Sequence, residues 1–271
     1  MEHPNNIEHK KEYSNIRDAQ GQFISGGITG IVELLDNGTA LKSPFPGVEF
    51  ENHVQDIAKE ASIYRRNGPH KRLVQLLGHF RNGLVLEYME NGDLKTYLQT
   101  HDSISTSLKL KWAYQIAEAV ELLHRNGVIH CDIRPRNLLL DIALDIKIID
   151  FSGSSLDGSK PASGEATRFF LPRHWSDQPT VTTDLFALGS TIFELFQGTC
   201  PYEEIPNFPN VSGIPCGQII KQCWLSEVDS AAQVQSAVGD IISHSVNTDC
   251  TPRLDGSDIC QDMLIDQAVP P

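Results

Sequence analysis

A short polar loop between two apolar strands constrains this chain more than any other feature. The loop runs from His130 to Asn137 and contains Asp132, and Asp150 stands at the end of the next apolar stretch. Transfer of a phosphoryl group needs a carboxylate that orients the attacking hydroxyl and accepts its proton, together with oxygen ligands for a metal ion. Asp132 suits the first task, and Asn137 with Asp150 suits the second. Taken singly these are ordinary turn residues, so only their combination indicates phosphoryl transfer.

The order of the expected elements predicts an α+β fold with two lobes. A small antiparallel sheet with one helix comes first, and a mainly helical lobe follows. An extended pattern from Phe23 to Lys42 turns at Asp36–Gly38, which is typical of a hairpin. The later helices are a long amphipathic one and one that is apolar nearly all round. The expected helices are Glu49–Arg66, Leu108–Arg125, Val181–Gln197 and Gln218–Leu225, and the expected strands after the first helix are Leu73–Phe80 and Leu84–Tyr88.

Composition sets the expected boundaries. Residues 1–16 are expected to form a flexible arm, residues 17–240 the folded domain, and residues 241–271 a polar, acidic, weakly ordered tail. Within the domain we expect a first lobe at 17–90 and a second at 91–240.

Charge and cysteine spacing limit the partners and the compartment. The formal net charge of −13 argues against a nucleic acid partner, which needs a cationic face. No apolar run reaches the length of a membrane span, so no membrane insertion is expected. The six cysteines contain no C-x-x-C pair, which favours reduced thiols and an intracellular location, cytoplasmic or nuclear. The oligomeric state is not indicated.

Several segments in order resemble the motifs of the eukaryotic protein kinase family. His130–Asn137 resembles the catalytic loop H-R-D-x-x-x-x-N, and Asp150–Ser152 resembles D-F-G. Thr39–Lys42 resembles the strand motif V-A-I-K, and Ser25–Val32 resembles the Gly-rich loop G-x-G-x-x-G-x-V with Ser25 in place of its first glycine. Thr183–Gly189 is similar to the start of the family's central buried helix. The resemblance covers about residues 20–235 and implies a two-lobed kinase fold.

The resemblance implies roles for the polar residues of the second lobe. Asp132 would be the catalytic base, and Asn137 with Asp150 would hold Mg²⁺. Arg134 would offset charge on the transferred phosphoryl group, and Asp184 would steady the catalytic loop. The implied activity is transfer of phosphate from ATP to hydroxyls of an unidentified protein substrate, with Ser/Thr favoured over Tyr.

The resemblance also implies an ATP site in the first lobe. Lys42 would bind the α- and β-phosphates and pair with Glu60 on the helix 49–66. The backbone of Glu87 and Met89 would meet the adenine, and Leu86 would be the gatekeeper. The other residues expected to line this site are Ser25, Gly27, Gly30, Val32, Ala40 and Leu139.

The chain departs from the family pattern at several positions. Cys131 stands where regulated kinases carry an arginine that binds a phosphate on the activation segment, so we expect activity that does not need this phosphate. Ser152 replaces a glycine, Arg134 replaces a lysine, and Ala166 aligns with a threonine that braces the catalytic aspartate. We expect that a helix that often docks substrates in the family is largely missing before Cys223. The compact size resembles a group of small kinases found in fungi.

Arg173 replaces the glutamate of the A-P-E motif, so the charge at this position is reversed. In the family that glutamate pairs with an arginine after a late helix. Here the matching segment offers Glu227 and Asp229 instead. The resemblance therefore suggests an ion pair between Arg173 and one of these two carboxylates, with a solvent-exposed Arg173 as the alternative.

Other functions remain open from sequence alone. A pseudokinase that acts as an ATP-binding or interaction scaffold is suggested by Ser25, Ser152 and Arg173. A small-molecule phosphotransferase with a related fold shares the H-x-D-x-x-x-x-N loop. A truncated reading frame is a third alternative, suggested by the missing helix.

Overall fold

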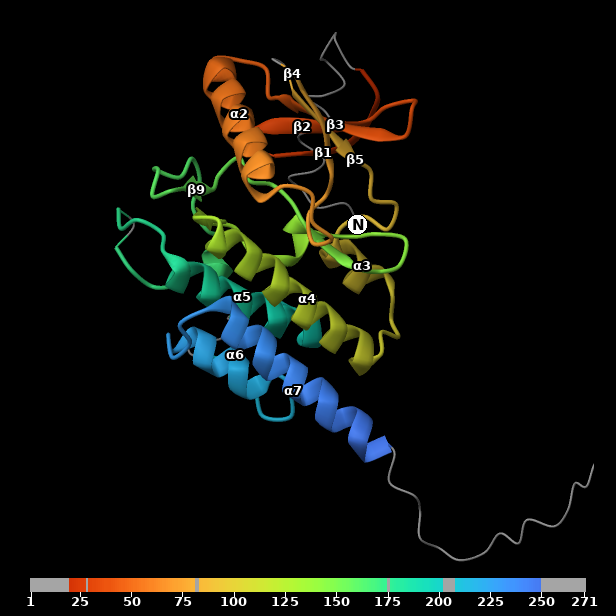
Figure 1. Cartoon of the computed structure of the whole chain (residues 1–271), viewed down its shortest axis with the longest axis vertical. Helices are drawn as coiled ribbons and strands as arrows, with labels where there is room; N and C mark the ends of the chain where they lie inside the picture. The colour runs from red at the N-terminus through yellow and green to blue at the C-terminus, as the bar shows by residue number, and fades with distance from the viewer. Residues whose placement is uncertain (1–19, 28, 81–82, 175, 202–207, 250–271) are drawn as a thin grey trace, which may run out of the picture.

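A five-stranded antiparallel sheet and one helix form the first lobe, which we call the N-lobe. The computed structural model describes residues 20–249 except 28, 81–82, 175 and 202–207 (Figure 1). The expected arm at residues 1–16 lies outside this range. The sheet has the strand order β1-β2-β3-β5-β4, and helix α2 lies against it. The elements are β1 (Gln22–Gly26), β2 (Gly30–Leu34), β3 (Thr39–Pro44), α2 (Phe50–Asn67), β4 (Leu76–Phe80) and β5 (Gly83–Glu87).

The hairpin register of β2 and β3 positions Lys42. The turn between the strands closes with the Gly38 N–H donating to the Leu35 carbonyl, and Gly38 has a φ of 80°, which glycine adopts without strain. Val32 then stands opposite Lys42 on the next strand. Because alternate residues of a strand share a face, Lys42 points to the same side as the buried Ala40.

The second lobe, or C-lobe, is mainly helical (Figure 1). The central helix α5 is buried continuously from Thr183 to Leu195, as its nearly uniform apolar character predicts. The helices of the C-lobe are α3 (Leu94–Thr100), α4 (Thr106–Arg125), α5 (Val181–Gln197), α6 (Gly217–Trp224) and α7 (Ala231–Asp249), with 3-10 turns at Pro135–Asn137 and Thr167–Phe169. Its strand pairs are β6 (Val128–Ile129) with β9 (Ser155–Leu156), and β7 (Leu138–Leu140) with β8 (Ile146–Ile148).

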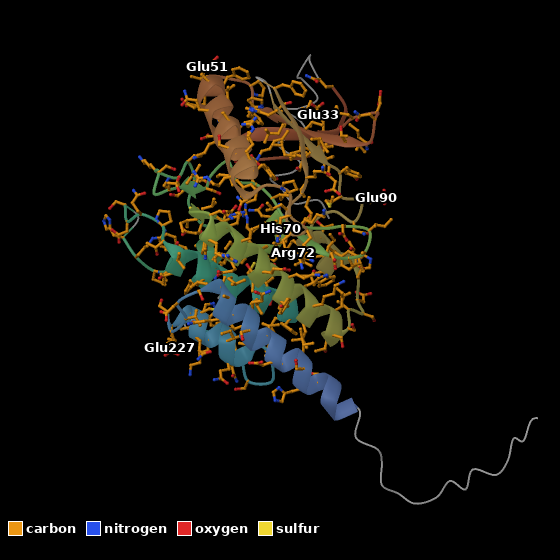
Figure 2. The ribbon with its side chains drawn as sticks, in the orientation of Figure 1. Glu33, Glu51, His70, Arg72, Glu90 and Glu227 are labelled. Carbon is orange, nitrogen blue, oxygen red and sulfur yellow. The ribbon has the colours of Figure 1, made fainter. Side chains whose placement is uncertain are left out.

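Arg72 fastens the loop after α2 to the C-lobe. Figure 2 places Arg72 at the junction of the two lobes, and its side chain is 4% exposed. Its guanidinium donates to the Ile146 carbonyl at 3.0 Å and lies 2.9 Å from a carboxylate oxygen of Glu118 on α4. These buried contacts of Arg72 attach the loop after α2 to helix α4 and strand β8 of the C-lobe.

Helix α7 continues past residue 240, where the sequence analysis placed the start of a weakly ordered tail. Ala231, Val234 and Val238 repeat at helical spacing and are fully buried, and α7 packs along α4. Burial of this apolar stripe stabilises helix where the flanking polar residues suggested none. Residues 250–271 lie outside the described range.

The C-lobe is short between α5 and α6, as expected from the sequence. In the part of this connection that the structure describes, residues 198–201 and 208–216, there is no helix. Among the described helices, none combines the length and the apolar character needed to cross a membrane.

Candidate active site

A cluster of three charged side chains joins the two lobes. Lys42 Nζ on β3 lies 2.6 Å from Glu60 Oε2 on α2 and 2.7 Å from Asp150 Oδ1. The side chains of Lys42 and Glu60 are 9% and 1% exposed, whereas that of Asp150 is 39% exposed. The pairing of Lys42 with Glu60 that the resemblance implied is therefore present, and one face of the Asp150 carboxylate remains open to a ligand.

The charges in this cluster stabilise one another. Burial by itself lowers the pKa of Lys42, but Asp150 and then Glu60 outweigh burial and raise that pKa above its ordinary value. Burial raises the pKa of Asp150, yet the charge of Lys42 and hydrogen bonds from Lys42 and Ser152 lower it to about 2. Asp150 is thus anionic across the neutral range and suited to bind a cation.

Asp132 presents one carboxylate oxygen without a partner. Its Oδ2 accepts a hydrogen bond from Asn137 Nδ2 at 2.9 Å and lies 2.9 Å from a guanidinium nitrogen of Arg134. Its Oδ1 is buried and has no hydrogen-bond partner among the described residues. Buried acceptors are rarely left unsatisfied. This oxygen therefore keeps an unused capacity to accept a hydrogen bond.

Asp184 fixes the start of the loop His130–Asn137 through hydrogen bonds to its backbone. This fully buried carboxylate accepts the backbone N–H of His130 at 2.7 Å and of Cys131 at 3.0 Å, and it also contacts His124 Nε2 at 3.0 Å. Cys131 has a φ of 66°, which is unusual for a residue with a side chain. The two hydrogen bonds maintain this conformation and so determine where the next residue, Asp132, projects.

Two edge-to-face ring contacts connect α2 to the loop His130–Asn137. The Phe151 ring is fully buried, with ring centroids 5.0 Å from Tyr64 on α2 and 5.4 Å from His130. Phe151 follows Asp150 directly, so these contacts maintain the position of the carboxylate that pairs with Lys42. The sequence offered no signal for the contact between Tyr64 and Phe151.

Close backbone packing explains one glycine of the Gly-rich loop. A Cβ at Gly30 would lie 2.6 Å from the Ser43 carbonyl oxygen, so β2 and β3 could not approach as they do with a larger residue. A Cβ at Gly27 would instead meet only the Gly30 carbonyl oxygen, at 4.0 Å, and the Gly27 N–H donates to that carbonyl. Ser25, in place of the family's first glycine, stands opposite Val32 in the β1–β2 pair.

The connection between the lobes begins where β5 ends at Glu87. The Glu87 N–H donates to the Gln75 carbonyl at 3.0 Å, and its carboxylate lies 3.1 Å from Lys147 Nζ. The Met89 carbonyl accepts from the Gly92 N–H, and the Met89 N–H has no backbone acceptor among the described residues. That donor is available to an adenine ring. Leu86 is buried on β5 and stands opposite Ala40 of β3, and Leu139 of β7 forms a bridge with Asp93 just after the connection. Val32 lies on β2, the next strand of the sheet.

The suggested ion pair of Arg173 with Asp229 or Glu227 is wrong. The Arg173 guanidinium donates to both carboxylate oxygens of Glu165 at 2.9 Å, and it lies over the Phe170 ring at 4.4 Å. Glu227 lies just beyond α6 (Figure 2), and Asp229 donates its backbone N–H to Gln233. The activation segment folds back on itself, so Arg173 finds its partner eight positions earlier in the chain.

We expect this pair to couple strongly in stability. The side chains of Glu165 and Arg173 are 1% and 14% exposed, and removing one side of such a buried pair typically costs about 3–5 kcal/mol. Arg173→Ala should therefore lower the free energy of unfolding in urea, and Arg173→Ala with Glu165→Ala should lower it by less than the sum of the single changes. Arg173→Ala combined with Asp229→Ala is the matched control and should be additive. A coupling below about 0.5 kcal/mol between Arg173 and Glu165 would contradict this expectation.

The oxygen donors at the site fit Mg²⁺ together with a nucleotide. Among the described residues no group of three His, Cys, Asp or Glu side chains could hold a metal by itself. Mg²⁺ commonly binds one or two protein oxygens and takes its remaining ligands from phosphates and water. Asn137 uses its amide nitrogen on Asp132, which leaves its amide oxygen for a cation, and Asp150 keeps an exposed carboxylate face.

Comparison with known proteins identifies the family. The protein kinase domain family matches residues 32–265, so this chain belongs to that family. Aurora kinase of Candida glabrata is 30% identical over 215 residues, which is 75% of this chain and 56% of that protein. Human receptor-interacting serine/threonine-protein kinase 1 is 29% identical over 187 residues, 60% of this chain and 28% of that protein. Human mitogen-activated protein kinase kinase kinase 3 is 28% identical over 222 residues, 73% of this chain and 35% of that protein. The chain therefore spans about half or less of the length of these relatives.

Proposed function

We propose that this chain is an active protein kinase that transfers the γ-phosphate of Mg-ATP to serine or threonine hydroxyls of a protein substrate. The observation that carries the proposal is the pair of contacts from Lys42 Nζ, at 2.6 Å to Glu60 and 2.7 Å to Asp150. These contacts hold α2, β3 and the segment after β8 in one arrangement, so Lys42 and Asp150 lie together, as the proposed binding of phosphate and metal requires.

The roles follow from the geometry and charge of each group. Lys42 would bind phosphate oxygens, and Asn137 with Asp150 would hold Mg²⁺, which when bound offsets charge on the phosphates. Asp132 orients the substrate hydroxyl and accepts its proton through Oδ1. Arg134, which contacts Asp132 at 2.9 Å, offers a planar cation to the phosphoryl group as it moves.

The adenine end of the nucleotide would occupy the connection between the lobes. The backbone of Glu87 and Met89 would bond the base edge, beside Leu86. The phosphates would lie under the Gly-rich loop. The residues proposed to surround the base and phosphates are Ser25, Gly27, Gly30, Val32, Ala40 and Leu139.

Specificity for serine and threonine is supported by one relative that is named as a serine/threonine-protein kinase, and a second is named as a serine/threonine/tyrosine-protein kinase. We also propose an intracellular location, supported by the free thiols of Cys131, Cys216 and Cys223. The protein substrate is unidentified.

One experiment tests the proposed activity. Purified chain is incubated with magnesium and γ-labelled ATP, and with peptide libraries in which serine, threonine or tyrosine is the sole acceptor. Label should enter the serine and threonine libraries well above the tyrosine library. A melting temperature raised by Mg-ATP without any label transfer would instead support a pseudokinase. The contact between Thr29 of the Gly-rich loop and Ser152 favours that alternative.

Arg134 should control the acid limit of the reaction. Asp132 must be ionised to accept a proton, and burial raises its pKa while Arg134 lowers it. Turnover should therefore fall as the pH drops through this raised pKa, because the protonated carboxyl cannot act as a base. Arg134→Gln removes the lowering charge and should move the fall to higher pH. Arg136→Gln is the control, because Arg136 is exposed and should leave the acid limit in place. An unmoved acid limit in Arg134→Gln would rule out Asp132 as the titrating base.

A further inference from the structure

A hydroxyl bridge closes the Gly-rich loop over the phosphate site. Thr29 Oγ1, in the loop between β1 and β2, lies 2.9 Å from Ser152 Oγ, although the two residues are 123 positions apart. Ser152 Oγ donates in turn to Asp150 Oδ1 at 3.0 Å, and Lys42 Nζ lies 3.5 Å from the same hydroxyl. The bridge therefore links the loop directly to the charged cluster.

The direction of the hydrogen bonds follows from the number of protons. A serine hydroxyl has one proton to donate, and Ser152 gives it to the Asp150 carboxylate. Thr29 must then donate to Ser152. Ser152 is 3% exposed, so these bonds are shielded from water. Because Ser152 accepts from Thr29 while it donates to an ionised carboxylate, its hydroxyl is the central member of the chain.

The backbone on both sides supports the bridge. The Thr29 carbonyl accepts the Phe45 N–H at 3.1 Å, and the Gly27 N–H donates to the Gly30 carbonyl at 2.9 Å, so Thr29 is attached to the residue after β3. Ser152 is not among the described residues with positive φ, so a serine is accommodated there without backbone strain.

We propose that Ser152 is a positioning residue that holds the Gly-rich loop, through Thr29, against Asp150 and thereby controls access of a nucleotide to the phosphate site. The proposal rests on the proposed function in that the ligand is a magnesium nucleotide. The consecutive contacts of 2.9 and 3.0 Å place Thr29 Oγ1 within about 6 Å of Asp150 Oδ1. Two oxygens on adjacent positions of one octahedral Mg²⁺ lie about 3 Å apart. The Ser152 hydroxyl already fills the space between Thr29 Oγ1 and Asp150 Oδ1, at hydrogen-bond distance from both. The bridge must therefore open before a metal-linked phosphate can lie between these two atoms.

Binding kinetics of a fluorescent N-methylanthraniloyl-ADP, measured by stopped flow with magnesium, test this proposal. Ser152→Ala and Thr29→Val remove one hydroxyl each, and each should raise the association rate constant about two- to tenfold, the effect of one net hydrogen bond. The double variant should match the single ones, because either change alone breaks the bridge. Thr29→Ser keeps a hydroxyl and should keep the original rate. Ser243→Ala removes a serine hydroxyl on α7, far along the chain from the loop, and should also change nothing.

A second measurement separates this proposal from the proposed function. Hydrogen exchange without nucleotide should be faster in the peptide covering β1, the loop and β2 in Ser152→Ala and Thr29→Val than in the original chain or Ser243→Ala. Unchanged exchange in that peptide, or equal association rates in a chain that binds the nucleotide, would overturn the bridge. Faster exchange in a chain that binds no nucleotide would uphold the bridge as a loop contact and refute both nucleotide binding and control of access.

Discussion

Asp132→Asn should reduce phosphate transfer by about a hundredfold to ten-thousandfold while nucleotide binding persists. The amide is close in shape to the carboxylate but is a far weaker base, so it cannot take the proton of the substrate hydroxyl. A loss of this size corresponds to about 2.7–5.5 kcal/mol in the activation barrier. Lys42, Glu60 and Asp150 are untouched, so the rise in melting temperature with Mg-ATP should remain. Label transfer and melting curves on the same preparations measure both quantities.

Asp102→Asn is the matched control for this change. Asp102 is exposed in the loop between α3 and α4, so its substitution should alter neither label transfer nor melting temperature. If Asp132→Asn retained more than a tenth of the original turnover, Asp132 would not be the base. If it abolished nucleotide binding as well, the residue would instead be needed to maintain the site.

Lys42→Met should remove most of the stabilisation by Mg-ATP and all measurable transfer. Ligand at about a hundred times its dissociation constant adds about 2.7 kcal/mol to the stability of a protein. For a chain of this size that corresponds to a shift of about 5–10 °C in melting temperature. Methionine cannot bind phosphate oxygens, so the shift in the variant should nearly vanish. Lys221→Met, on the exposed face of α6, should keep the full shift.

Lys42→Met should also destabilise the chain without ligand. Glu60, whose side chain is 1% exposed, would lose its cation, and an unpaired buried charge typically costs about 3–5 kcal/mol. The variant with both Lys42→Met and Glu60→Leu should regain part of this loss, because the lone carboxylate is gone. If the melting curves of the original chain and of Lys42→Met responded equally to Mg-ATP, Lys42 would not bind the nucleotide.

The linkage of these charges to pH has a definite sign. The folded-state pKa of Asp150 is lowered to about 2 from an ordinary value of 3.8. Its contribution to stability is therefore complete above pH 3.8 and is lost as the pH falls toward 2. The pKa of Lys42 is raised, so its contribution is complete below its ordinary value of 10.5 and is lost only above that. Neither group limits stability near neutral pH.

Much of the fold could be predicted because local patterns and ordered motifs agree. The central helix was predicted with the bounds Val181–Gln197 that the structure has, since a fully buried helix is apolar on nearly every side. The loop His130–Asn137 was recognisable from residue types and spacing. By contrast, α7 was missed because its buried stripe at Val234 and Val238 is narrow and lies among polar residues.

The partner of Arg173 could not be predicted because ion pairs depend on the path of the chain in space. The resemblance to the kinase family suggested Glu227 or Asp229, which follow helix α6, as the partner. The activation segment folds so that Glu165 reaches Arg173 first, with both carboxylate oxygens engaged. The sequence shows which charged residues are present, but the distances between their side chains depend on the fold.

The sequence by itself determined the family, the two lobes and the identity of the charged residues around the proposed phosphate site, because those features follow from local periodicity and from motifs of fixed spacing. Only the tertiary structure decided which groups meet. Thr29, between β1 and β2, contacts Ser152 in the segment after β8. Asp132 keeps one oxygen without a partner because Asn137 and Arg134 both contact the other one. A hydrogen bond forms only within about 3 Å and near a favoured angle, and packing of the two lobes, rather than sequence spacing, sets those distances.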